Sequence, residues 1–178
     1  RKYIIQENWQ NIVEYKILPK YVKMWTEFVQ KYQLKNYDYD EASKELYVYE
    51  DLDLSAQNLC KLPVKLGEVH GRFDISNNDF ILLVNMPRKV YGTFNASYNR
   101  ILTLSGCPLY IEGDFNISYN KIDHLQGFPS YLGGKLYCEG NELSPENLDP
   151  YWGMKLKENP YLILDIKDDV SANLREQY

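Results

Sequence analysis

The sequence has few of the residues on which many active sites and small secreted scaffolds depend. Its 178 residues include only two histidines and three cysteines. His70 and His124 have no ligand-spaced Cys, Asp or Glu cluster around them, so neither a zinc site nor a histidine-based active site is indicated. Three cysteines without a Cys-x-x-Cys motif cannot all pair internally, which favours a reduced, intracellular protein.

Basic charge and long hydrophobic runs are also scarce. The chain has 20 Lys and Arg against 25 Asp and Glu, a net charge of −5. Nucleic acids and anionic membranes are therefore not expected as partners, because binding them broadly needs clustered cations. The longest apolar run, residues 80–84, is far shorter than the roughly 20 residues that span a bilayer. The sequence opens at Arg1 rather than Met, from which we expect a trimmed N-terminus, so the cysteines alone carry the prediction of a cytoplasmic protein.

Motifs for catalysis and ligand binding are missing as well. The segment GFPSYLGGK at residues 127–135 lacks the GxxxxGK[ST] spacing of a phosphate loop. The acidic clusters at residues 38–41 and 50–53 lack the calcium-loop pattern. The glycosylation sequons at Asn95 and Asn116 fall on predicted strands and are interpreted as repeat positions. We expect no enzyme, no cofactor and no metal. An enzyme with an unrecognised site stays open as an alternative, beside the two non-enzymatic functions given at the end of this section.

What the chain does have is aromatic residues, 15% of the total with 17 tyrosines, and an internal repeat of 21 residues. The repeat is marked by Gly71, Gly92, Gly113 and Gly134, by Phe73, Phe94, Phe115 and Leu136, by Ile75, Ala96, Ile117 and Cys138, and by Asn78, Asn99, Asn120 and Asn141. Alternating apolar residues predict short parallel strands at 52–55, 73–76, 94–97, 115–118 and 136–139. The asparagines suit a buried ladder of turns, and the prolines of the return segments favour extended or 3₁₀ chain over a helix.

These columns resemble the leucine-rich repeat family, whose core pattern is LxxLxLxxNxL. The closest stretch is residues 52–59, LDLSAQNL, and later units read FDISNNDF, FNASYNRI, FNISYNKI and LYCEGNEL. Two features depart from the pattern: the leading apolar residue lies nine positions before the Asn, and Gln57 stands in the Asn column. The units are similar to short repeats of bacterial and viral proteins. The resemblance, over residues 48–143, implies an α+β solenoid with a parallel β-sheet, an N-terminal helical cap and a short C-terminal cap.

We predict three parts: an N-terminal helical cap over 1–45, the solenoid over 46–143, and a degenerate repeat with a C-terminal cap over 144–178. The elements expected outside the repeat are helices around Trp9–Ile17 and Val22–Tyr32, a solvated connector at 37–41, a strand at 161–166 and a terminal helix at 168–178. A cap is favoured for residues 1–45 because the first repeat needs a cover. The alternative is a separate pair of partner-binding helices.

The outward strand positions are the candidates for function, since packing occupies the inward ones. The predicted partner-binding residues are Asp74, Asn95, Asn116 and Tyr137 in one outward column, with Tyr98 and Tyr119 at its edge. Tyrosine provides contact area at low entropic cost, although small polar residues are also simply tolerated on strand surfaces. A second aromatic column, Tyr110, Tyr131 and Trp152, is interpreted as shielding of the return segments rather than as a binding site.

These observations favour a non-enzymatic protein-binding module that uses its concave sheet face. The resemblance to bacterial and viral repeats implies an intracellular inhibitor or adaptor that acts on a host protein. The alternative is a structural or assembly protein that self-associates through the solenoid.

Overall fold

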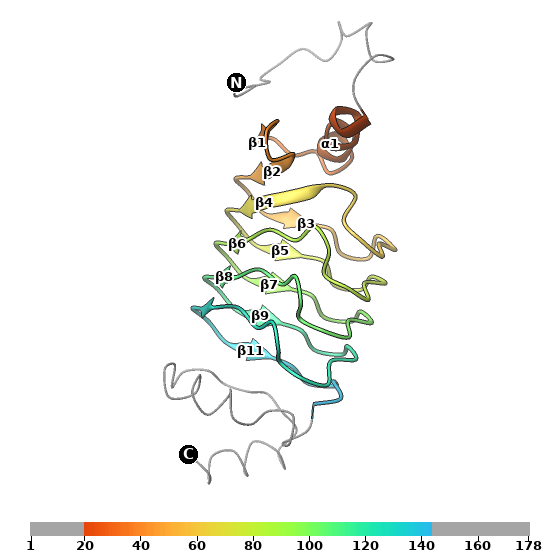
Figure 1. Ribbon diagram of the computed structural model, residues 1–178, viewed down its shortest axis with the longest axis vertical. Coiled ribbons are helices and arrows are strands. Elements are labelled where there is room, and N and C mark those ends of the chain that lie inside the picture. The colour runs from red at the N-terminus through yellow and green to blue at the C-terminus, as the bar shows by residue number, and fades with distance from the viewer. Residues whose placement is uncertain (1–19, 144–178) are drawn as a thin grey trace, which may run out of the picture.

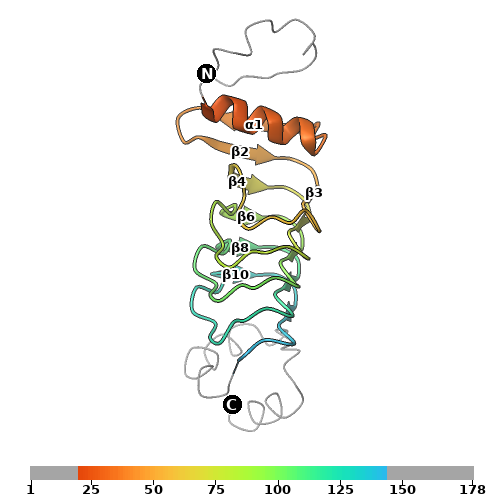
Figure 2. The same cartoon turned by 90° about the vertical axis from the view of Figure 1, so that its right-hand side faces the viewer.

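The computed structural model describes residues 20–143, which form a β-solenoid with one helix at its N-terminal end (Figure 1). The elements are α1 (Lys20–Lys31), β1 (Tyr37–Asp40), β2 (Glu45–Val48), β3 (Leu52–Asp53), β4 (Lys65–Val69), β5 (Phe73–Asp74), β6 (Lys89–Val90), β7 (Phe94–Asn95), β8 (Tyr110–Ile111), β9 (Phe115–Asn116), β10 (Tyr131–Leu132) and β11 (Leu136–Tyr137). Each repeat is one rung of a stack that is elongated and close to straight in both views (Figures 1 and 2).

The predicted parallel sheet is confirmed, with strand order β11-β9-β7-β5-β3. Its register joins residues 21 positions apart, as in the pairs Phe73↔Phe94 and Phe94↔Phe115. These three phenylalanine rings stack inside the solenoid at centroid distances of 5.1 and 5.3 Å and are fully buried. The strand that stacks on its own copies therefore builds a continuous core.

The asparagine ladder is confirmed as well. Asn78, Asn99 and Asn120 are buried, and Asn141 on the last described rung is half-buried. The amide of Asn99, for example, donates to the carbonyls of Ile75 and Ala96 while its oxygen accepts from the N–H of Phe80. One side chain thereby satisfies backbone groups on its own rung and on the rung before it.

The return segments are extended, as predicted, but they also form a second sheet that the sequence analysis missed. Its order is β1-β2-β4-β6-β8-β10, with β1 antiparallel to β2 and the other neighbours parallel. The inward side chains of this sheet form a buried apolar column: Val48, Val69, Val90, Ile111 and Leu132. The solenoid is therefore a two-sided stack whose core lies between two sheets.

The glycine before each strand is required by close approach. A Cβ at Gly92 would lie 2.7 Å from the backbone of Gly71, and one at Gly113 would lie 2.7 Å from that of Gly92. Real side chains do not tolerate such contacts, so the glycine column allows the turns between the two sheets to stack at rung spacing.

Two expectations for the N-terminal region have different outcomes. The second predicted helix is confirmed as α1, whose Trp25, Phe28 and Val29 are buried in the core cluster. The solvated connector at 37–41 is wrong, because residues 37–40 form strand β1 and Tyr39 stacks on Trp25 at 4.8 Å. The alternation Tyr-Asp-Tyr-Asp has the period of a strand, and its acidic residues concealed that signal.

The hairpin of β1 and β2 continues the return sheet, and β2 crosses the boundary predicted between residues 45 and 46. Figure 2 shows α1 lying across the end of the stack above β2. The helix predicted around Trp9–Ile17, the strand at 161–166, the helix at 168–178 and Trp152 lie outside the described residues.

Candidate functional site

The outward column predicted for partner binding lies on one face of the β3–β11 sheet. Register pairs Asp53 with Asp74, Asp74 with Asn95, Asn95 with Asn116, and Asn116 with Tyr137. Asp74 is only 8% exposed, while Asn95, Asn116 and Tyr137 are half-buried. The structure therefore brings the column together, but less of it reaches solvent than its outward direction suggests.

The Asp and Asn side chains of this column have a backbone task. The carboxylate of Asp74 accepts from the N–H of Ser76 at 2.9 Å, and the equivalent bond joins Asn116 to Ser118. In an uninterrupted parallel sheet the N–H of Ser76 would donate to the carbonyl of Leu54 on the preceding rung. The side-chain amide of Asn78 donates to that carbonyl instead. The strands that carry this bond consequently end after two residues, and the column is partly structural.

The signal for this arrangement was present in the sequence. A pattern of Asp or Asn, any residue, then Ser recurs at residues 53–55, 74–76, 95–97 and 116–118. Asn95 adds a bond from its amide to the second carboxylate oxygen of Asp74 at 3.0 Å. The last rung departs from the pattern with Tyr137 and Glu139, so Tyr137 is not a member of this hydrogen-bonded series.

Tyr98 and Tyr119 are the most exposed of the predicted site residues. They are 53% and 41% exposed, and their rings stack at 4.5 Å with an interplanar angle of 14°. Both have left-handed backbone conformations, with φ of 53° and 56°. The equivalent positions on other rungs, all left-handed too, are Ala56, Asn77 and Gly140. Bulky residues rarely adopt this conformation, whereas Gly and Asn adopt it at low cost.

The surroundings of Tyr119 hold its ring in place. A Cβ at Gly140 would lie 2.6 Å from this ring, so the next rung passes directly beneath it. A hydrogen bond with Glu139 is the main cause that raises the pKa of the Tyr119 hydroxyl above its ordinary value. The pair is thus an ordered, hydroxyl-bearing aromatic edge at the corner of the β3–β11 face.

A longer aromatic ladder covers the outside of the other sheet. Neighbouring rings lie 4.4 to 5.8 Å apart along the sequence Tyr49, His70, Tyr91, Tyr110 and Tyr131. The ladder changes column after Tyr91 because Glu112 and Gly133 stand in the positions that continue it. The second aromatic column predicted from the sequence includes Tyr110 and Tyr131, whose rings stack with a centroid distance of 4.5 Å. The sequence analysis missed the N-terminal half of this ladder, although Tyr49, His70 and Tyr91 stand 21 residues apart in the sequence.

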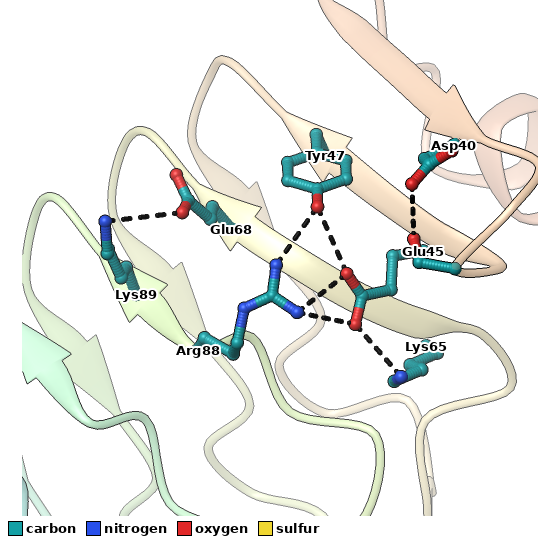
Figure 3. A network of polar contacts seen from close by, with 8 residues as sticks. Asp40, Glu45, Tyr47, Lys65, Glu68, Arg88 and Lys89 are labelled. Atoms are coloured by element: carbon teal, nitrogen blue, oxygen red, sulfur yellow. Dashed lines mark hydrogen bonds and ion pairs between the residues drawn. The ribbon is translucent and has the colours of Figure 1, made fainter.

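A buried carboxylate anchors the same sheet near its N-terminal end (Figure 3). Glu45 is 2% exposed and is bonded by the guanidinium of Arg88 at 2.8 Å and by Lys65 at 3.0 Å. Burial opposes ionisation of Glu45, but hydrogen bonds from Lys65, Arg88 and Tyr47 outweigh it and lower its pKa. A group paired in this way on all sides connects rungs and is not available to a ligand.

Groups for other chemistry are sparse in the described part of the chain. Within residues 20–143 no three His, Cys, Asp or Glu side chains are grouped to hold a metal ion. Cys60 is exposed, whereas Cys107 and Cys138 are buried, and burial raises the pKa of the Cys107 thiol well above its ordinary value. No helix in the same range has the length and apolar character needed to cross a bilayer.

Comparison with protein-family models, curated proteins and solved structures found no match for this chain.

Proposed function

We propose that this chain is a non-enzymatic protein-binding module related in design to leucine-rich repeats, with Tyr98 and Tyr119 as anchors at the edge of the β3–β11 face. The observation that carries the proposal is their exposed pairing in a left-handed backbone conformation. Backbone outliers of this kind cost about 1–3 kcal/mol each and accumulate at functional sites.

Packing of the core does not require tyrosine at these two positions. Asn77 and Gly140 hold the same place on neighbouring rungs with less strain, and the tyrosine rings lie outside the core. Aromatic side chains that are already ordered lose little entropy on binding, and tyrosine is enriched among residues that dominate binding energy. A partner that covers the pair would explain why the strained residue is there.

The proposal extends to the cellular setting and to the kind of target. Three cysteines without a Cys-x-x-Cys motif and the repeat pattern support a cytoplasmic inhibitor or adaptor, and the similarity to short bacterial and viral repeats supports a host protein as its target. Self-association through the solenoid is the alternative, and the experiment below separates the two.

The test replaces each tyrosine with the residue that its own backbone conformation prefers. Full-length wild type, Tyr98→Asn and Tyr119→Asn are used to capture proteins from a lysate of the source organism, and affinity for the captured protein is then measured by calorimetry. We expect each variant to melt at or above the wild-type temperature, since strain is relieved. Each should lose about 1 kcal/mol of binding, or roughly fivefold in affinity.

The matched control is Asn77→Ala, which changes the same corner one rung earlier without touching the ring pair. Variants that melt lower and bind as tightly as wild type would assign the tyrosines to structure and contradict the proposal. A chain that captures only itself, with a dimer seen by sedimentation, would instead support assembly.

A further inference from the structure

The loops that follow the asparagine ladder expose an aliphatic patch that repeat packing does not require. Its four members, between 44% and 51% exposed, are Ile81, Leu82, Val84 and Leu102. The backbone N–H of Leu102 donates to the carbonyl of Ile81 at 3.2 Å, so the two loops are neighbours. The equivalent positions carry no large aliphatic residue on the rungs before and after: they are Cys60, Lys61 and Pro63 on one side and Asp123, His124 and Gln126 on the other.

A pair of cations separates this patch from the tyrosine corner. Along the third rung Tyr98, Arg100 and Leu102 face outward, because Asn99 and Ile101 between them are buried. Lys121 is the equivalent of Arg100 one rung later, and the side chains of both are about 60% exposed. On the third rung a tyrosine, a cation and an aliphatic side chain therefore follow one another around one corner of the solenoid, while the middle position is Asp79 on the second rung and Lys121 on the fourth.

Along the middle column the two cations lie next to each other, with one carboxylate on either side of the pair. Arg100 pairs with Asp79 on the rung before at 3.1 Å, and Lys121 pairs with Glu142 on the rung after at 3.4 Å. The order along the stack is thus acid, base, base, acid. Exposed ion pairs of this kind contribute little to stability, so a carboxylate from another molecule can replace either intramolecular partner at small cost.

We infer that the aliphatic patch together with Arg100 and Lys121 binds an acidic–aliphatic segment of a partner protein, one in which Asp or Glu stands beside Leu, Ile, Val or Phe. The inference rests on the proposed function and extends it to the chemistry of the partner. An apolar centre rimmed by polar groups is the usual anatomy of a protein interface. The central cations select carboxylates over amines.

The experiment pans a random twelve-residue peptide library on the full chain and measures the enriched peptides by fluorescence anisotropy. We expect enriched sequences to combine carboxylates with aliphatic or aromatic residues. Leu102→Asp should weaken them at least tenfold, because it places a charge in the apolar centre. The double variant Arg100→Glu, Lys121→Glu should weaken them at least fivefold, with a smaller effect at high salt.

The matched control is Ser130→Asp, which adds the same charge to an exposed position outside the patch and outside the repeat columns of its members, and should leave affinity unchanged. Melting curves of all variants show whether the fold persists. Enrichment of basic peptides, no enrichment at all, or equal affinity for Leu102→Asp would overturn the inference. Peptides that are lost in Tyr98→Asn and retained in Leu102→Asp would overturn it while upholding the proposed function.

Two other occupants of the patch are distinguished by measurements on the same proteins. A dimer in sedimentation that Leu102→Asp dissolves would assign the patch to contacts between copies of this chain. Flotation with phosphatidylcholine vesicles that the same variant abolishes would assign it to a lipid surface. Either result would overturn the assignment to an acidic–aliphatic peptide.

Discussion

At the scale of single residues, the three rungs that contain β5, β7 and β9 each use two amide or carboxylate side chains for two different backbone tasks. The side chain at the strand, such as Asn116, accepts from an N–H two residues later and ends the strand. The side chain at the turn, such as Asn120, bonds the carbonyl left open on the preceding rung. The two tasks are complementary. The strand side chain accepts from the N–H that would otherwise bond the preceding rung, and the turn side chain donates to the carbonyl that this N–H leaves open.

Asn120→Ala tests this division of work. The substitution leaves the buried N–H of Ile101 and the carbonyls of Ala96 and Ile117 without their side-chain partner. We expect the free energy of unfolding to fall by about 1–3 kcal/mol, the cost of buried groups without hydrogen bonds. Chemical denaturation measures the change, with exposed Gln126→Ala on the same rung as the control. Equal midpoints for wild type and Asn120→Ala would refute the ladder as a source of stability.

At the scale of elements, the first hairpin joins the solenoid through a buried charge as well as through its backbone. Glu45 begins β2, while its partners Lys65 and Arg88 come from the two following rungs. Three consecutive segments of the return sheet are therefore tied to one carboxylate, as Figure 3 shows. Removing a single partner from a buried ionic group is costly because the remaining groups lose their compensation.

The pKa of Glu45 gives this connection a pH dependence. Because its pKa is lower in the folded than in the unfolded protein, the ionised carboxylate contributes stability above about pH 4.5. That contribution is lost as the pH falls further, through the folded pKa. Glu45→Gln should destabilise the chain by about 1.5–3 kcal/mol at pH 7, the range for hydrogen bonds to charged groups.

The measurement compares the unfolding free energies of wild type and Glu45→Gln from pH 7 down to pH 3. The difference between the two proteins should become smaller as the pH falls. Glu142→Gln is the control, since its ion pair with Lys121 is exposed and should give a small, nearly constant difference. A Glu45→Gln effect that is independent of pH would show that shape rather than charge matters at this position.

The elements also show what sequence reasoning could reach. Strong periodicity located the β3–β11 sheet and the asparagine ladder, because those columns repeat one residue type. The second sheet was missed because β6, β8 and β10 each contribute a single inward apolar residue, so no alternation is visible in the return segments. The tyrosine pair was found, but its left-handed backbone was not. Ala, Asn, Tyr and Gly share one column, and only the structure shows that their common feature is a left-handed backbone conformation. The backbone task of Asp74 and Asn116 was missed because the repeated Ser was assigned to the strand surface.

At the scale of the whole molecule, the solenoid is a stack whose rungs contact mainly their neighbours, so its ends decide its solubility. The described N-terminal end is covered by α1, which lays Trp25, Phe28 and Val29 on the core, and by the β1–β2 hairpin, which extends the return sheet (Figure 2). The helix lies over the end of the stack and the hairpin over the edge of one sheet. Together they form one cover made from two kinds of element.

Deleting residues 1–36 tests whether the helix acts as this cover or as a binding element. We expect the truncated chain to aggregate or unfold, because the apolar core end that α1 covers would face water. Deletion of 1–19 alone separates the contribution of α1 from that of the preceding segment. Phe28→Ala, at a side chain that is 3% exposed, should cost about 3–5 kcal/mol without removing any chain. If the 1–36 deletion stays monomeric and melts like wild type but no longer captures the partner, the helix binds and does not cap.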